Sequence, residues 1–177
     1  KRMGGTNVKL LVLSDTHGYL ENARNVLERI GQRMDGVLHL GDHAYDARDL
    51  QSEYQTLPFY FVKGNNDFAD KAPNDVILKF FGKKLLLTHG HKQQVYWSHD
   101  TISYWAEEKG ADVVIFGHTH SPVNEHKGSV MIFNPGSISL PSGVPNPTFG
   151  ILEITEQGLI YGSIMEYIDA QTFLRKK

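Results

Sequence analysis

Short apolar runs alternate with helical patterns in the first half of the chain. The runs at residues 9–13, 36–40 and 59–63 have the length and continuity of strands that are buried on both faces. Between them, apolar residues recur at helical spacing over residues 20–30 and 47–54. This alternation of strand and helix predicts a parallel sheet with helices packed against it.

The second half of the chain has a different pattern. Residues 76–88 indicate a hairpin that turns at Gly82 and Lys83, and a helix that carries Trp105 ends near Gly110. Further strand-like runs lie at residues 113–116, 130–133, 149–154 and 159–166. Because Gly, Pro, Asn and Ser separate these runs at short intervals, we expect mostly antiparallel pairing in this half.

The length of the chain suits one domain. It has 177 residues, and no linker, repeat or low-complexity segment divides it. We expect a single domain over residues 8–168, with a polar leader at residues 1–7 and a C-terminal tail at residues 169–177. Within that domain, the pattern predicts two packed sheets with helices outside them.

Composition excludes several classes of function. The 18 Lys and Arg residues against 20 Asp and Glu give a net charge of −2, so we expect no strong binding to nucleic acid. No apolar run reaches the ~18 residues of a membrane span, and no secretory signal is evident, which favours a cytoplasmic protein without a membrane partner. The absence of cysteine excludes disulfides, thiolate metal sites and cysteine nucleophiles. Whether the chain forms a homo-oligomer is left open.

Five predicted strands are followed at once by residues that commonly bind metal ions. The segments are Ser14-Asp15-Thr16-His17-Gly18, Gly41-Asp42-His43, Gly64-Asn65-Asn66-Asp67, Thr88-His89-Gly90-His91 and Gly117-His118-Thr119-His120. Ligand sites in α/β sheets form at the carboxyl ends of the strands, so these loops can converge on one crevice. Each segment alone is common by chance, but five of them at strand ends together indicate a site.

The residue types in these loops indicate two transition-metal ions. Carboxylate and amide oxygens with imidazole nitrogens suit Mn, Fe, Co, Ni or Zn. Seven candidate ligands, more than one ion needs, fit two ions about 3.5–4 Å apart that share a carboxylate. The seven are Asp15, His17, Asp42, Asn65, His89, His118 and His120. Asp42, central in chain order, is our candidate for the bridge.

The remaining histidines and the aromatic residues near these loops lie outside the candidate ligand set. We expect His39 in the core, His99 and His126 at the surface, and His43 in the pocket without contact to metal. The aromatic residues near the loops are Tyr19, Tyr45, Phe68, Tyr96 and Trp97. They either stack a base or an aryl leaving group, or pack the loops onto the sheet, and both interpretations stay open.

The ordered set of segments resembles the calcineurin-type metallophosphoesterase superfamily. The short length, the Thr88-His89-Gly90-His91 segment and the Asn134-Pro135-Gly136-Ser137 segment are similar to its small bacterial and archaeal phosphodiesterase branch. The resemblance covers about residues 9–166. It implies an α/β (α+β) fold, a four-layer αββα sandwich of two mixed sheets, with a dinuclear metal site at its edge.

The resemblance also implies a ligand set and a reaction. Asp15, His17 and His120 would hold one ion. Asn65, His89 and His118 would hold the other, and Asp42 would bridge them. The expected ions are two Mn²⁺, with Ni²⁺, Zn²⁺, Fe²⁺ or Co²⁺ as alternatives. The expected reaction is the hydrolysis of a small phosphodiester by in-line attack of a metal-bridging hydroxide.

The sequence departs from the superfamily at one position that matters for catalysis. The residue after the Asn ligand is usually a His that protonates the leaving group, and here it is Asn66. An amide cannot act as a general acid, so we expect His91, or second His43, to do so, or a substrate with a good leaving group. Two alternatives stay open. One is a phosphomonoesterase, and the other is a non-catalytic metal-binding scaffold like the retromer subunit that shares this fold. Intact Asp42 and Asn65 favour catalysis, because that subunit has lost both.

Overall fold

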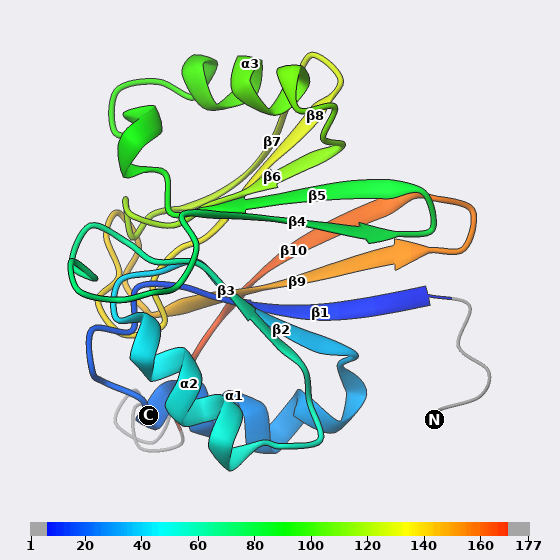
Figure 1. Ribbon diagram of the computed structural model, residues 1–177. Coiled ribbons are helices and arrows are strands. Elements are labelled where there is room, and N and C mark those ends of the chain that lie inside the picture. Colours follow the sequence, from blue (N-terminus) through cyan, green and yellow to red (C-terminus); the bar gives the residue numbers. More distant parts are fainter. Residues whose placement is uncertain (1–6, 170–177) are drawn as a thin grey trace.

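The computed structural model describes residues 7–169, which form four layers. Two five-stranded sheets lie face to face. Helices α1 (Glu21–Ile30) and α2 (Ala44–Glu53) cover the outer face of one sheet, and α3 (Asp100–Glu108) covers the outer face of the other (Figure 1). The predicted αββα sandwich of two mixed sheets is therefore confirmed.

The first sheet has the strand order β10-β9-β1-β2-β3. Its strands are β1 (Asn7–Leu13), β2 (Gly36–His39), β3 (Phe59–Phe61), β9 (Thr148–Thr155) and β10 (Ile160–Glu166). β1, β2 and β3 are parallel as predicted, whereas β9 pairs antiparallel with both β1 and β10. Asn7, which we expected in the leader, is instead the first residue of β1, because it pairs with Thr155.

The second sheet has the strand order β4-β5-β6-β8-β7. Its strands are β4 (Asp75–Phe80), β5 (Lys83–Thr88), β6 (Val113–Ile115), β7 (Pro122–Lys127) and β8 (Val130–Pro135). The expectation of mostly antiparallel pairing is wrong for the centre of this sheet, where β5, β6 and β8 are parallel. A parallel pair needs a crossover connection, and α3 provides it between β5 and β6.

The inner strands β1, β2, β5, β6 and β8 are largely apolar because both of their faces are buried. In β1, Leu10 and Val12 pack between the two sheets, while Leu11 and Leu13 pack beneath the helices of the first sheet. The strands β5, β6 and β8 divide their side chains in the same way between the central core and the core under α3. β7 was not predicted, because its polar outward-facing residues interrupt the apolar pattern.

Short connections differ slightly from the predicted ones. The β4–β5 hairpin turns at Phe81 and Gly82, one residue earlier than expected, and both have positive φ (49° and 76°). A two-residue turn of this kind requires positive φ at both positions. α1 ends at Ile30, as the helical spacing over residues 20–30 predicts. The 3₁₀ helix η1 (Gly31–Arg33) follows it, and a second 3₁₀ helix, η2 (His91–Gln93), follows β5.

The carboxyl ends of the parallel strands meet at one end of the molecule (Figure 1). The loops after β1, β2, β3, β5 and β6 therefore share that end. Residues 1–6 and 170–177, which make up most of the expected leader and tail, lie outside the described residues. No helix within residues 7–169 has the length and apolar character to cross a membrane.

Candidate metal centre

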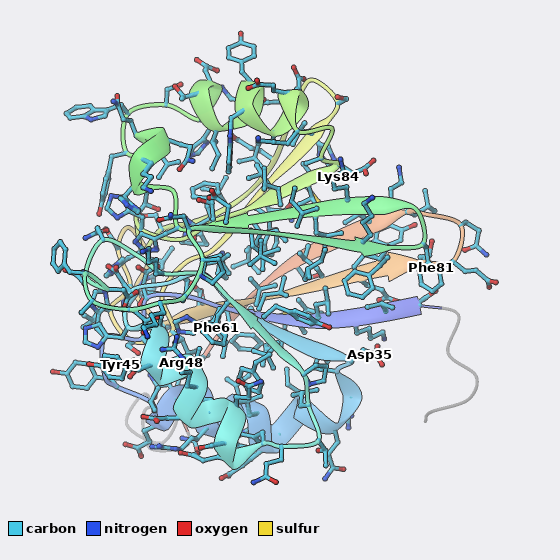
Figure 2. The ribbon with its side chains drawn as sticks, in the orientation of Figure 1. Asp35, Tyr45, Arg48, Phe61, Phe81 and Lys84 are labelled. Carbon is cyan, nitrogen blue, oxygen red and sulfur yellow. The ribbon has the colours of Figure 1, made fainter. Side chains whose placement is uncertain are left out.

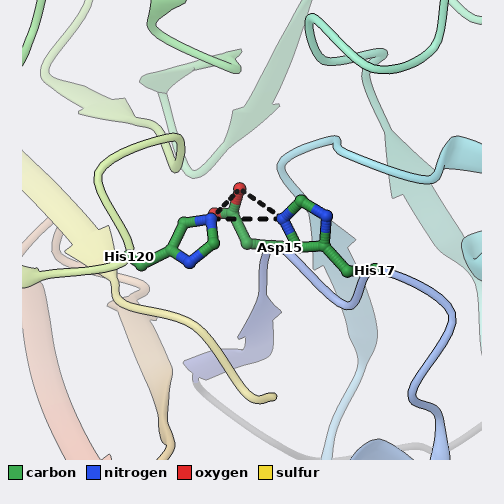
Figure 3. A group of neighbouring side chains, drawn as sticks. All are labelled: Asp15, His17 and His120. Carbon is green, nitrogen blue, oxygen red and sulfur yellow. Dashed lines mark hydrogen bonds and ion pairs between the residues drawn. The ribbon is translucent and has the colours of Figure 1, made fainter. Parts of the chain in front are cut away.

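Asp15, His17 and His120 form the first group of potential ligands (Figure 3). The Nε2 atoms of His17 and His120 lie 3.2 Å apart. Asp15 Oδ1 lies 3.4 Å from His120 Nε2 and 4.0 Å from His17 Nε2. Three ligand atoms thus face a common point, although Asp15 and His120 are separated by more than a hundred residues in the sequence.

A second group lies against the first. His89 Nε2 is 3.1 Å from Asn65 Oδ1 and 3.4 Å from Asp42 Oδ1. The ring of His118 has its centroid 5.0 Å from that of His89. Potential ligand atoms of Asp15, Asp42 and His89 also lie within 4.8 Å of one another. All seven residues predicted from the sequence are therefore brought together.

Asp42 lies between the two groups, with one oxygen toward each. Its Oδ2 is 3.7 Å from His17 Nε2, and its Oδ1 is 3.4 Å from His89 Nε2. A carboxylate in this position can give one oxygen to each of two cations. The side chain is also almost fully buried, so its charge is poorly screened by water.

Backbone carbonyls orient two of the histidines. His89 Nδ1 lies 2.6 Å from the carbonyl oxygen of Leu40, and His120 Nδ1 lies 2.7 Å from that of Leu140. A carbonyl oxygen only accepts, so Nδ1 carries the proton in both rings. Nε2 is therefore the atom with the free lone pair, and it is the atom that faces the centre. Metal-binding histidines are commonly held in this way.

Asp15 provides a direct test of whether a cation fits. The residue is fully buried, and its Oδ2 accepts hydrogen bonds from Ser14 Oγ (2.6 Å) and from the backbone N–H of His118 (3.0 Å). Oδ1, which faces His17 and His120, has no hydrogen-bond partner. Burial alone raises the pKa of Asp15, but the rings of His120 and His89 lower it more, so the carboxyl is ionised. A buried anionic oxygen without a partner is costly unless a cation binds it, and the residues therefore fit a metal ion.

The same neighbours shift the pKa values of the histidines in different directions. Burial lowers the pKa of His17 and lowers that of His118 to about 4, with His89 adding to the effect at His118. Asp15 raises the pKa of His120 above its usual 6.5. The lowered pKa values favour the neutral rings of His17 and His118, which is the form that binds metal. The raised pKa of His120 keeps that ring protonated up to a higher pH.

The backbone of these loops is unusual in a way that the sequence did not reveal. Five of the seven residues have positive φ, a region that residues other than glycine seldom occupy; they are Asp15, His17, Asp42, His118 and His120. Two glycines allow the loops to approach closely. A Cβ on Gly64 would lie 2.1 Å from Asp42 Oδ1, and one on Gly117 would lie 1.9 Å from Ser14 Oγ. Such strained backbone is concentrated at functional sites.

Two buried carboxylates outside the ligand set tie the loops together. Asp67 accepts hydrogen bonds from the backbone N–H groups of Ala44 (2.8 Å) and Gly64 (2.7 Å). Asp46 accepts them from Thr16 Oγ1 (2.6 Å) and the N–H of Gly18 (2.8 Å). Asp46 was missed in the sequence because it lies in a helix, and Asp67 was quoted there without a role. Their function is to fix the loops that carry Asp42, Asn65 and His17.

The two candidates for the general acid flank the centre on different sides. The His91 ring lies 5.4 Å from that of His89, its Nδ1 is buried without a partner, and burial lowers its pKa. The His43 ring lies 5.3 Å from that of His17, with Nδ1 3.2 Å from Tyr45 Oη. Neither His91 nor His43 forms a hydrogen bond or an ion pair with any of the seven candidate ligands.

The remaining three histidines, His39, His99 and His126, lie outside the candidate centre. His39 is fully buried as predicted, with Nε2 3.1 Å from Thr16 Oγ1, and burial lowers its pKa to about 4. His126 is exposed, also as predicted. His99, expected at the surface, is half-buried: its Nδ1 lies 2.7 Å from Glu125 Oε1 and its ring packs against Phe116.

An αββα sandwich with clustered Asp, Asn and His side chains at the strand ends is the arrangement expected of the metallophosphoesterase class. The chain belongs to the calcineurin-like phosphoesterase superfamily, whose domain matches residues 8–157. It is 34% identical to the probable metallophosphoesterase YsnB of Bacillus subtilis over 147 residues, which are 83% of this chain and 85% of that protein. It is 30% identical to a phosphodiesterase of Methanocaldococcus jannaschii over 165 residues, covering 82% of this chain and 93% of the relative.

The fold is also shared with a protein whose name refers to vacuolar sorting. Vacuolar protein sorting 29 from Cryptosporidium parvum superimposes with a TM-score of 0.72 at 17% sequence identity, covering 92% of this chain and all of that one. A likeness at this identity concerns the fold alone. The fold by itself therefore does not establish the function.

Proposed function

We propose that this protein is a phosphodiesterase that binds two divalent transition-metal ions and hydrolyses a small phosphodiester. The observation that carries the proposal is the position of Asp42, whose two oxygens face the two groups of ligands separately. The named relatives among the metallophosphoesterases support the same class of reaction. The retention of both Asp42 and Asn65 in the cluster favours catalysis over a metal-binding scaffold.

In this proposal Asp15, His17 and His120 hold one ion, and Asp42 is shared. Asn65, His89 and His118 hold the other. When bound, two such ions supply a nucleophile derived from water at neutral pH and positive charge against the phosphoryl oxygens. We propose Mn²⁺ as the native ion because the family resemblance implies it, while the ligand types suit several transition metals. Asp46 and Asp67 keep the loops in place, so the ligands need not reorganise during the reaction.

Hydrolysis adds water across one ester bond: the oxygen joins phosphorus, and a proton goes to the leaving oxygen. Asn66 cannot provide that proton, and its amide instead donates to Asp42. We propose His91 as the donor, with His43 as the second candidate. Since the two rings lie on different sides of the centre, each would serve one orientation of the leaving group. His91→Ala and His43→Ala, compared over a range of pH, identify which ring limits turnover.

The direct test removes all metal with a chelator and adds back Mn²⁺, Ni²⁺, Zn²⁺ or Mg²⁺ singly. Hydrolysis of bis(4-nitrophenyl) phosphate is compared with that of 4-nitrophenyl phosphate. We expect turnover of the diester and little of the monoester. Turnover of the monoester alone would reassign the protein as a phosphatase. Turnover of neither ester with any ion, in protein shown to bind that ion, would instead favour the scaffold.

A further inference from the structure

Exposed aromatic side chains surround the candidate metal centre. Eight aromatic residues within residues 7–169 are exposed, and five of them lie on or beside the loops that carry the ligands. These five, which we call the aromatic rim, are Tyr19, Tyr45, Phe68, Tyr96 and Trp97. Their exposed fractions run from 53% for Tyr45 to 91% for Phe68, so each side chain leaves half or more of its surface open to a ligand. Apolar surface gathered beside a polar site is typical of a ligand-binding surface.

Two rim residues are held on different sides of the centre. The Tyr45 ring lies 5.4 Å from that of His43, which in turn lies 5.3 Å from His17. The Tyr96 ring lies 4.7 Å from that of His118, and its Oη donates a 2.9 Å hydrogen bond to the His118 carbonyl. Figure 2 shows Tyr45 at the end of the molecule opposite Phe81. The Tyr96 ring thus lies directly against one group of ligands, and the Tyr45 ring lies beside the other with His43 between them.

We propose that the aromatic rim binds the bases of a small nucleoside phosphodiester, an inference that rests on the proposed function. A phosphodiester has two ester arms, and Tyr45 and Tyr96 offer an aromatic face to an arm on either side of the phosphate. Nucleobases stack on such side chains with little sequence preference. The net charge of −2 disfavours long nucleic acid and favours a substrate of one or two nucleotides.

The test uses two diesters with the same leaving group, 4-nitrophenol, so that the chemical step is matched. One is thymidine 5′-(4-nitrophenyl phosphate), and the other is methyl 4-nitrophenyl phosphate. With Mn²⁺ bound, we expect kcat/KM for the thymidine ester to exceed that for the methyl ester by about tenfold or more, mainly through KM, as expected for stacking. Equal values, or a preference for the methyl ester, would overturn the proposal.

Variants assign the preference to the rim. The double variant Tyr45→Leu/Tyr96→Leu should reduce the ratio of the two kcat/KM values by about fivefold or more, and the single variants show which side holds the base. Tyr96→Phe keeps the ring and should keep the ratio. Tyr104→Leu is the matched control, because Tyr104 is 70% exposed on α3, away from the ligand loops. An unchanged ratio in the double variant would assign the preference elsewhere.

Binding without turnover separates this inference from the proposed function. Thymidine 5′-monophosphate should quench the fluorescence of Trp97 more strongly than methyl phosphate does at equal concentration. Trp97 is 88% exposed, whereas Trp105 packs against the core under α3, so Trp97→Phe should abolish the difference. If neither ester is hydrolysed but the quenching depends on the base, the proposed phosphodiesterase activity is wrong and base binding by the aromatic rim is supported. If the esters are hydrolysed and the two compounds quench equally, base binding by the aromatic rim is wrong while the proposed activity is retained.

Discussion

Asn66 holds both oxygens of Asp42. Its backbone N–H donates to Oδ1 (3.0 Å), and its Nδ2 donates to Oδ2 (2.7 Å). The residue that replaces the usual histidine of the superfamily is therefore engaged with the proposed bridging carboxylate. Hydrogen bonds to a charged carboxylate are about twice as strong as neutral ones, and two of them restrict its rotation. Asn66 thus positions Asp42 between the two groups of ligands.

Asn66→Ala removes the side-chain hydrogen bond and leaves the one from the backbone. We expect the affinity for both ions to fall by about tenfold, because one charge-assisted hydrogen bond contributes about 1.5 kcal/mol and Asp42 is shared. Isothermal titration with Mn²⁺ measures the change. Asn124→Ala, on β7, is the control, since Asn124 Nδ2 donates only to the Gly162 carbonyl. Unchanged affinity in Asn66→Ala would mean that Asp42 needs no such support.

The shared position of Asp42 makes a second prediction about metal content. Asp42→Asn removes the negative charge that the proposal has both ions share and replaces one oxygen by an amide nitrogen that cannot bind metal, so the affinity for both ions should fall together. His17→Ala removes a ligand from one group only and should mainly weaken one ion. The number of ions per chain, measured by elemental analysis after dialysis, distinguishes the two variants. A loss of the same single ion in both would show that Asp42 does not bridge.

Metal binding should depend on pH through His120. Asp15 raises the pKa of His120 above 6.5, so this ring is protonated below that value and must lose its proton to bind an ion. His118, with a pKa of about 4, has no proton to lose at pH 6. Affinity should therefore fall as pH drops through the pKa of His120, approaching tenfold per unit for one proton.

Two measurements check this dependence. A pH titration of the metal-free protein followed by NMR should show His120 losing its proton at a much higher pH than His118. Asp15→Asn removes the charge responsible and should lower the pKa of His120. Calorimetry in two buffers with different ionisation enthalpies should detect release of a proton when Mn²⁺ binds near pH 6. If no proton is released there, His120 is not a ligand.

The sequence predicted the clustering of the seven candidate ligands better than it predicted the pairing of the strands. Metal chemistry is limited to a few residue types, and they stand directly after apolar strands, so the clustering of Asp42, His89 and the other ligands followed from the pattern. Strand pairing depends on residues far apart in the chain. β9 follows β8 in sequence but pairs with β1, through contacts such as Leu10 opposite Leu152, which no local pattern contains.

The details that hold the site in place were not predictable for a related reason. Asp and His adopt positive φ more readily than most residues, but whether His17 or Asp42 does so depends on the whole loop. Asp46 reads as an ordinary polar residue of a helix, and only its distances to Thr16 and Gly18 show its function. Loop geometry of this kind is fixed by tertiary contacts, which the one-dimensional pattern does not record.

His39 makes the stability of the fold sensitive to acid. Burial lowers its pKa from 6.5 to about 4 in the folded protein. Between those values the unfolded chain binds a proton that the folded chain does not, so stability is fully present above pH 6.5 and declines as pH falls toward 4. The size of the shift corresponds to a loss of about 2 kcal/mol between pH 7 and pH 4.5.

Urea unfolding of metal-free protein at several pH values measures this loss. In His39→Gln the titrating ring is gone, while an amide can still donate to Thr16. The variant is expected to be less stable at pH 7, but its free energy of unfolding should decline less steeply toward pH 4.5 than that of the wild type. The difference between the two slopes isolates His39 from the other histidines, which titrate in both proteins. Parallel slopes would mean that His39 is hydrated or protonated in the folded state, contrary to its buried position between Thr16 and Gly41.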